Sequence, residues 1–262
     1  RYKTAYDYSY GVESLKQYAY MLKQNEQYEE AKQAFKNLGI EIGSPYEYRK
    51  EIAACDIAIA WDKEPNLEYS VEGADFNTGQ ADYAPTLYEN NQLVFTSDRG
   101  SSTGEDLYNW TGNKYSDLFI VDLNSELVRP FDDNINSKYN DGTAVFTSNY
   151  SEMYFTRCYS GEKYEDNYCK LMMSQRSGDS WTVPVVLPFV KEKVNYGHPA
   201  ISANGNFLYF SSNDPEGWGG FDIYVSERTP DGWSEPSLLS RSVNTMLDEQ
   251  FPFLDGDTLY FA

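Results

Sequence analysis

Four short segments of this sequence share one pattern, in which apolar residues lead into a Phe that is followed by a small residue. They lie at residues 93–96, 153–156, 208–211 and 259–262. From Phe95 to Phe155, Phe210 and Phe261, the successive intervals are 60, 55 and 51 residues. A near-constant recurrence of this length is typical of propeller blades and repeat arrays. The repeat therefore predicts the fold class before any other feature is considered.

Each repeat carries the signals of four short antiparallel strands. A segment that ends in a small residue or Pro precedes each Phe strand, at residues 82–85, 141–144, 196–199 and 249–252. A third strand with alternating apolar residues follows at 117–121, 170–174 and 222–226. A fourth is predicted after a Trp turn, at 180–184 and 232–236. Four antiparallel strands per repeat describe a propeller blade.

The number of repeats predicts an incomplete propeller. Three full repeats and half of a fourth are present, whereas propellers close with about four to eight blades. We therefore expect a truncated propeller of about three and a half blades, cut from a longer polypeptide. Residues 67–71 are predicted to be the outer strand that closes the ring. A chain ending at residue 262 is accordingly expected to be unfolded or aggregated, because its sheet edges stay open.

Charge and hydrophobicity narrow the classes of partner. The net charge is −20. Residues 1–60 carry 9 acidic and 8 basic side chains, whereas residues 61–262 carry 32 acidic and 13 basic ones. A propeller this acidic repels phosphate backbones, so no nucleic-acid partner is expected. No apolar run approaches the roughly 18 residues that a membrane span needs, so the chain is not expected to span a membrane itself.

Residues 1–61 have helical periodicity instead of strand signals. Two amphipathic helices are predicted, with Asn25 as the N-cap of the second and Gly39 at its end. Their packing positions fit a tetratricopeptide repeat, with Leu15, Tyr18, Ala19, Leu22, Ala31 and Phe35 as the packing residues. The predicted fold class is therefore α+β multidomain. Tetratricopeptide-like helices over 1–61 precede an incomplete all-β propeller of four-stranded blades over 62–262.

A third helix is predicted from a clear starting signal. Ser44 is placed at the N-cap, Pro45 at the first helical position and Glu47 at the third. This arrangement predicts a capping box, in which Ser44 and Glu47 each satisfy a backbone donor of the other. Cys55 lies on the apolar face of this helix and is expected to remain a buried free thiol.

The order of these parts, and several motifs within the blades, resemble a known family. The motifs are Asp-Tyr-Ala-Pro at 82–85, Leu-Val-Phe-Thr-Ser-Asp-Arg-Gly at 93–100, and the stretch 197–226 with Gly-His-Pro-Ala-Ile-Ser and Gly-Gly-Phe-Asp-Ile-Tyr-Val-Ser. Over residues 12–262 the chain resembles the PorE-like, OmpA-family proteins of the Bacteroidetes type IX secretion system, with TolB-like propeller repeats. The resemblance implies a periplasmic protein associated with the outer membrane. It also implies a peptidoglycan-binding OmpA-like domain that is not present in this chain.

Catalytic and metal-binding motifs are weak in this sequence. Residues 100–104 match the nucleophile-elbow pattern formally, but that chemistry needs a flanking strand and helix and a His base. The one His of the sequence, His198, lies in a predicted first strand, which favours a structural role. The Cys spacing fits no zinc site, and the acidic turns at 132–134 and 255–257 lack further calcium ligands. We therefore expect a protein that is not an enzyme and has no catalytic residue, cofactor or metal.

Two further site predictions concern a disulfide and a binding rim. Cys158 and Cys169 flank the loop between the second and third strands of one blade, so we expect them to form a disulfide in an oxidising compartment. The loops after the Phe strands are expected to lie near one rim, where partner contacts are tolerated. The candidate partner-binding residues there are Asp98, Arg99, His198, Asn213 and Asp214.

Three classes of function remain open from the sequence. The favoured one is a non-enzymatic periplasmic scaffold of type IX secretion or gliding machinery. It would link an outer-membrane β-barrel protein or a companion lipoprotein to peptidoglycan through the missing domain. The second is a TolB-like propeller that binds a partner peptide in envelope maintenance. The third is the propeller domain of a serine hydrolase.

Overall fold

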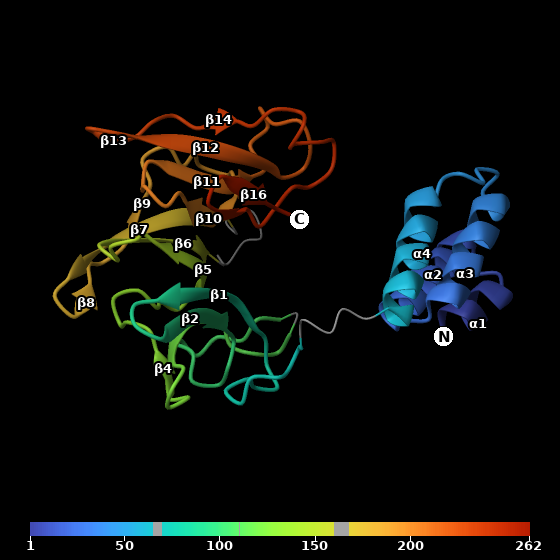
Figure 1. The fold of residues 1–262 in the computed structure, drawn as a ribbon, viewed down its shortest axis with the longest axis horizontal. Helices are drawn as coiled ribbons and strands as arrows, with labels where there is room; N and C mark the ends of the chain where they lie inside the picture. The colour runs from blue at the N-terminus through green and yellow to red at the C-terminus, as the bar shows by residue number, and fades with distance from the viewer. Residues whose placement is uncertain (65–69, 110, 160–167) are drawn as a thin grey trace. The chain divides into compact units, whose positions relative to one another are not determined.

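The structure is a computed structural model that describes residues 1–64, 70–109, 111–159 and 168–262 (Figure 1). It separates into two compact units, Arg1–Glu72 and Gly73–Ala262. The first unit is helical and the second consists of antiparallel sheets. In the described ranges, no helix has the length and apolar character required to cross a membrane.

The described residues of the helical unit form four helices, and one small core lies between α2, α3 and α4. They are α1 Tyr2–Asp7, α2 Val12–Gln24, α3 Tyr28–Glu41 and α4 Arg49–Lys63. Helices α2 and α3 form a hairpin and α4 packs on α3. Ala19 and Ala31 are fully buried beside Phe35, which places small residues where the helices approach closely. Cys55 is a buried free thiol in this core. The structure thus shows a helical hairpin with a third packed helix, and its assignment as a tetratricopeptide repeat stays a prediction.

The predicted helix boundaries are wrong at three positions. Asn25 lies at the C-cap of α2, where its side-chain amide donates to the Met21 carbonyl, and Gln27 is the N-cap of α3. Helix α4 begins at Arg49 after Tyr48, without a side-chain cap, so the capping box does not form. Gly39 does not end α3. A Cβ at Gly39 would lie 3.2 Å from the Pro45 Cα, so Gly39 permits the following turn to pack against the helix.

The second unit contains three sheets of four or five antiparallel strands in chain order. The strands of the first sheet are β1 Asp82–Tyr88, β2 Gln92–Ser97, β3 Asp117–Asp122 and β4 Val128–Pro130. Those of the second are β5 Asn140–Phe146, β6 Glu152–Cys158, β7 Cys169–Ser177, β8 Ser180–Trp181 and β9 Val185–Val186. Those of the third are β10 Tyr196–Ile201, β11 Phe207–Ser212, β12 Asp222–Thr229, β13 Gly232–Trp233 and β14 Ser237–Leu238. Each predicted Phe segment in these sheets is the second strand of its sheet.

The outer strands differ from the sequence prediction. The predicted fourth strands at 180–184 and 232–236 form only the short hairpin strands β8 and β13, which pair with the ends of β7 and β12. The outer ladder is made by β9 and β14, which follow Pro184 and Pro236. A Pro has no backbone donor for a sheet ladder, so the ladder resumes only after it.

The fourth repeat is a two-stranded sheet. It consists of β15 Phe253–Asp255 and β16 Thr258–Tyr260, extended by two backbone hydrogen bonds between Gln250 and Ala262. Residues 67–69 of the predicted closing strand at 67–71 lie outside the described residues. Its described residues, Ser70 and Val71, form no strand, and Val71 is 99% exposed.

The hydrophobic cores lie between neighbouring sheets. One core joins Leu118 and Ile120 of the first sheet to Met153 and Phe155 of the second. Another joins Tyr154 and Leu171 of the second sheet to Leu208 and Phe210 of the third. Figure 1 shows these sheets stacked in the order of the chain. Four-stranded antiparallel sheets that pack face to face in chain order define a propeller-like arrangement, so the chain has a propeller-like α+β fold.

Gly142 marks a point where two sheets approach too closely for a side chain. A Cβ at this position would lie 2.7 Å from Cγ2 of the fully buried Thr96 in the preceding sheet. Thr96 cannot turn away at low cost, because its Oγ1 accepts a hydrogen bond of 2.9 Å from the Thr143 amide.

We therefore expect Gly142→Ala to lower the free energy of unfolding by about 1 to 3 kcal/mol, since it overpacks this contact. Urea unfolding at equilibrium measures the difference. Gly100→Ala serves as the matched control, because a Cβ at Gly100 meets nothing within 4 Å. Equal stability of Gly142→Ala and the original protein would contradict the packing argument.

Candidate functional site

The first strand of each repeat contains a local backbone irregularity at the same position. Ala84, Thr143, His198 and Phe251 all have positive φ angles, of 50, 52, 54 and 54°. In β1, β5 and β10 the pairing register shifts at this point, as in a β-bulge. A non-glycine residue in this region costs on the order of 1–3 kcal/mol, and such strain is concentrated at functional sites. The recurrence therefore directs attention to the place where these residues meet.

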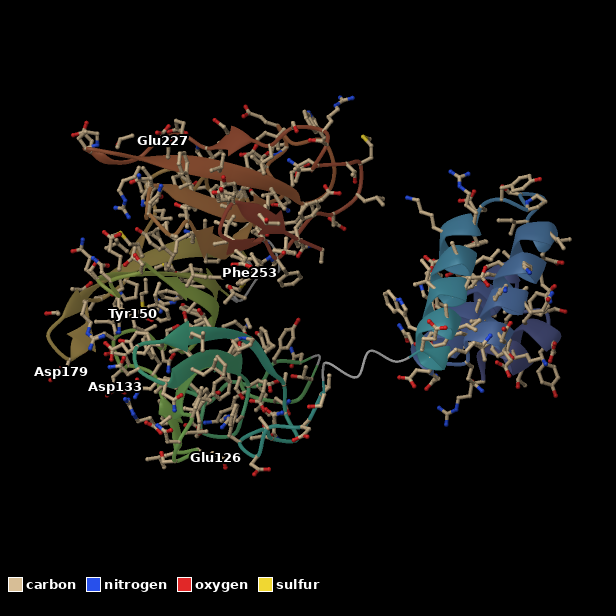
Figure 2. The ribbon with its side chains drawn as sticks, in the orientation of Figure 1. Glu126, Asp133, Tyr150, Asp179, Glu227 and Phe253 are labelled. Carbon is tan, nitrogen blue, oxygen red and sulfur yellow. A yellow bond between two sulfur atoms is a disulfide. The ribbon has the colours of Figure 1, made fainter. Side chains whose placement is uncertain are left out.

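The irregular segments of all four repeats meet around one pocket of about 210 Å³. Phe253, labelled in Figure 2, is one of the residues in its wall. Most of the lining is apolar, and Pro or Ala follows the strained residue in every repeat. The lining residues are Ala84, Pro85, Thr86, Thr143, Ala144, Val145, His198, Pro199, Phe251, Pro252 and Phe253. We refer to this set as the inner-strand pocket.

Hydrogen bonds between neighbouring sheets hold the pocket walls in place. The Thr143 amide donates to Thr96 Oγ1 of the first sheet at 2.9 Å. The His198 amide donates in the same way to Thr156 Oγ1 of the second sheet at 3.0 Å. The bulges of β5 and β10 are thus each held by the threonine that follows the Phe of the preceding sheet. The strained backbone at the pocket is held by packing and hydrogen bonds that form when the sheets associate.

Among the described residues of the pocket lining, His198 is the titratable one. Its Nδ1 lies 2.8 Å from Ser211 Oγ, and its ring centroid lies 3.9 Å from that of Phe251. Burial lowers the pKa of His198 to about 4, because the charged imidazolium loses its hydration there. The ring is therefore neutral at pH 7.

The five residues predicted for a binding rim have different roles in the structure. His198 lies in the pocket lining. Arg99 is 9% exposed and pairs with Asp82 at 2.7 Å, and Asp214 is 8% exposed and pairs with Lys191 at 2.6 Å.

The other two residues also accept local hydrogen bonds. Asp98 accepts from the Ala81 amide and from Asn113. Asn213 accepts from the Asn195 amide. The polar members of the set thus stabilise loops, and their role in partner binding stays a prediction.

Sequence reasoning did not identify most of the pocket. Pro85, Pro199 and Pro252 occur at the same position of three repeats and were used only to locate strands. The signal that could have indicated a site is this recurrence itself. A Pro in a strand has no backbone donor for the ladder and marks an edge or a bulge.

The formal nucleophile motif has no catalytic geometry within the described residues. Ser102 is 3% exposed, and its hydroxyl donates to the Ser97 carbonyl at 3.2 Å. His198 lies in the third sheet, and its ring contacts Ser211 and Phe251 instead. Across the described ranges, no group of three His, Cys, Asp or Glu residues is placed to hold a metal ion.

Among known proteins, this chain is similar only to solved structures. No family model and no curated protein matches the chain. A Mycobacterium tuberculosis puromycin-hydrolyzing peptidase matches with a TM-score of 0.41 and 12% identity over 62% of this chain and 24% of its own. A structure from a study of two prolyl endopeptidases matches with a TM-score of 0.44 and 14% identity, over 70% of this chain and 24% of its own. An α-L-arabinofuranosidase from Lactobacillus brevis matches with a TM-score of 0.43 and 12% identity, over 67% of this chain and 62% of its own.

These matches correct one expectation from the sequence. The three proteins are hydrolases by description, so the prediction that the chain is not an enzyme is contradicted and is not retained. The chain spans about a quarter of the length of each peptidase and 62% of the glycosidase. At 12 to 14% identity the likeness concerns the fold, and it assigns neither an activity nor a substrate to this chain.

The predicted cysteine pair is joined in the structure. Cys158 on β6 and Cys169 on β7 face each other across the ladder, and their Sγ atoms form a disulfide of 2.02 Å.

We expect mass spectrometry of the unreduced protein to find this bond intact. Replacing both residues by Ser should lower the free energy of unfolding by about 2 to 3 kcal/mol, because the closed loop spans about ten residues. Cys55→Ser is the control for loss of a thiol outside the bond. Free thiols at both Cys158 and Cys169 would refute the pairing.

The low pKa of His198 predicts a pH-dependent stability. Well above pH 6.5 the ring is neutral in both the folded and the unfolded state. Between pH 6.5 and about 4 the unfolded chain binds a proton that the folded chain does not. Stability is therefore present above pH 6.5 and is lost as the pH falls towards 4, by up to about 3 kcal/mol.

Urea unfolding from pH 7.5 to 4.5 measures this loss. His198→Asn is a suitable comparison, because Asn tolerates a positive φ and does not titrate. The variant should lose the histidine contribution and keep that of the carboxylates. The same pH profile in both proteins would show that His198 is not desolvated in the folded state.

Proposed function

We propose that the chain is a protein-binding scaffold of the bacterial cell envelope, and that the inner-strand pocket receives an extended segment of its partner. The observation that carries this proposal is the convergence of four equivalent strained segments on one mostly apolar pocket. Pockets with apolar walls and few polar groups are the usual form of a binding site.

The construction of the pocket supports binding in a further way. Its walls are fixed by hydrogen bonds between sheets, from the Thr143 and His198 amides. Little conformational entropy is therefore lost when a ligand enters. Phe251 and Phe253 are 54% and 63% exposed, so they present apolar surface that a partner segment could cover.

The helical unit offers a second surface of the same kind. A pocket of about 440 Å³ lies in this unit, and Leu15, Tyr18 and Ala34 of α2 and α3 contribute to its wall together with Lys3 and Tyr6 of α1. If the helices belong to a tetratricopeptide array, this is a surface for a second protein. A chain with two such units can hold two partners at once, which is what a scaffold requires.

The cellular setting of the proposal comes from the resemblance alone. The resemblance implies a location in the periplasm, associated with the outer membrane, and a role in type IX secretion or gliding machinery. The partner would be an outer-membrane β-barrel protein or a companion lipoprotein. Peptidoglycan would be bound through an OmpA-like domain elsewhere in the full polypeptide.

A pull-down from the native envelope tests the proposal. We expect the full chain to capture a partner and Phe253→Ala to lose most of that capture, because it removes the exposed aromatic side chain of the pocket wall. Phe207→Ala is the matched control, since Phe207 is also a strand residue, is 36% exposed and lies outside the pocket.

The same pair of variants gives a readout in cells. In a deletion strain of the native host, Phe207→Ala should restore secretion or surface motility, whereas Phe253→Ala should not. Equal capture and equal rescue by the two variants would overturn the assignment of the pocket as the binding site.

A further inference from the structure

The lining of the inner-strand pocket favours a ligand that donates a hydrogen bond over one that accepts it. Two hydroxyls near it are already engaged, since Thr143 Oγ1 donates to the Gly142 carbonyl and lies 2.7 Å from Thr156 Oγ1. Thr86 also lines the pocket, but a hydroxyl can rotate to donate or accept and sets no preference. The imidazole of His198 is the remaining polar side chain of the lining, and its orientation is fixed by Ser211.

The hydrogen-bond network at Ser211 determines the tautomer of His198. Ser211 is fully buried, and its hydroxyl has a single proton. The geometry allows this proton to be donated to the Gly197 carbonyl at 3.3 Å. Ser211 Oγ then accepts from His198 Nδ1–H at 2.8 Å. If Ser211 donated to Nδ1 instead, the bond to Gly197 would be lost, so the Nδ1–H tautomer makes one hydrogen bond more.

In this tautomer the other ring nitrogen, Nε2, is an acceptor. Within the described residues Nε2 has no hydrogen-bond partner, and it is not among the buried polar atoms that lack one. Among the described residues this leaves Nε2 with accessible surface, and His198 lines a pocket whose described lining contains no carboxylate and no cation. The ring stays neutral because burial disfavours its charged form and no carboxylate of the described residues contacts it.

We propose that the inner-strand pocket selects an apolar group with a single N–H donor, namely the indole of a tryptophan in the partner segment, and that His198 Nε2 accepts its hydrogen bond. This inference rests on the proposed function and names the chemistry of that site. An indole is a donor only, has a large apolar body and suits the proline and phenylalanine walls.

Other side chains fit this arrangement less well. Lys and Arg would give up hydration to walls without a carboxylate, and that loss is not compensated there. Phe would leave Nε2 without a donor when it displaces water from the pocket. The position of Phe251 against the His198 ring, at 3.9 Å between centroids, already places one aromatic surface where an indole could pack.

The tautomer can be measured without any ligand. His198 is the one His of the chain, so ¹⁵N-labelled histidine gives a single pair of ring-nitrogen signals. At pH 7 we expect a protonated Nδ1 and an unprotonated Nε2. Ser211→Ala should mix the tautomers, whereas Ser226→Ala should not, because Ser226 is an equally buried serine that bonds to the Ser234 carbonyl. A protonated Nε2 in the original protein would overturn the proposal.

Binding is tested with two probes that carry either a hydrogen or a methyl group on the indole nitrogen. N-acetyl-tryptophanamide and its indole-N-methyl derivative are titrated into the full chain, and the Nε2 signal is followed. We expect the first to bind about three- to tenfold more tightly, which is the value of one neutral hydrogen bond.

The variant His198→Phe should bind both probes equally. Phe is tolerated at this position, because Phe251 occupies it in the next repeat with the same positive φ. Equal affinity of the two probes for the original protein would refute the hydrogen bond but leave the pocket as a binding site. Absence of binding by either probe, together with unchanged partner capture by Phe253→Ala, would refute the pocket as well.

Discussion

The contacts of the β5 and β10 bulges with a threonine of the preceding sheet are the interactions on which the packing of the three larger sheets depends. Thr96 and Thr156 follow the repeated Phe, and each accepts a hydrogen bond from a strained amide in the next sheet. At Gly142 the backbone can approach this closely because the residue has no side chain, whereas a Cβ at Gly197 would meet Thr156 at an ordinary contact distance of 3.4 Å. One repeated contact therefore sets the spacing of the sheets, supports the strained backbone and shapes the pocket.

A second set of contacts ties the sheets together at their outer parts. Arg176 at the end of β7 pairs with Glu89 of the first sheet at 2.8 Å. Arg228 at the end of β12 pairs with Glu152 of the second sheet at 2.5 Å and also donates to Tyr154. Each pair joins a sheet to the sheet that precedes it in the chain. Since exposed pairs contribute little by themselves, their main effect is to fix the register of packing between sheets whose cores already match.

The sequence predicted the parts of the fold that repeat in residue type, and missed those that depend on backbone conformation. The Phe strands could be found because apolar residues must fill the space between sheets at one position of every repeat. The pocket could not, because Ala84, Thr143, His198 and Phe251 share a positive φ and no chemistry. The start of α4 was missed for a related reason, since the turn before it packs on Gly39 and this overrides the local capping signal.

The placement of charge separates two functions of the surface. Residues 73–262 carry 28 acidic and 12 basic side chains. In the described part of this unit, five of the basic side chains, those of Arg99, Arg157, Arg176, Lys191 and Arg228, form ion pairs within it. These cations are taken up by carboxylates of the same unit and leave a net acidic exterior, which acts on a partner at a distance and weakens with salt. The described lining of the inner-strand pocket has no charged residue, so in our proposal discrimination inside it rests on shape and on the direction of one hydrogen bond. In the proposed scaffold, attraction of a partner and selection of its segment are thus carried out by different physical forces, and each can change without the other.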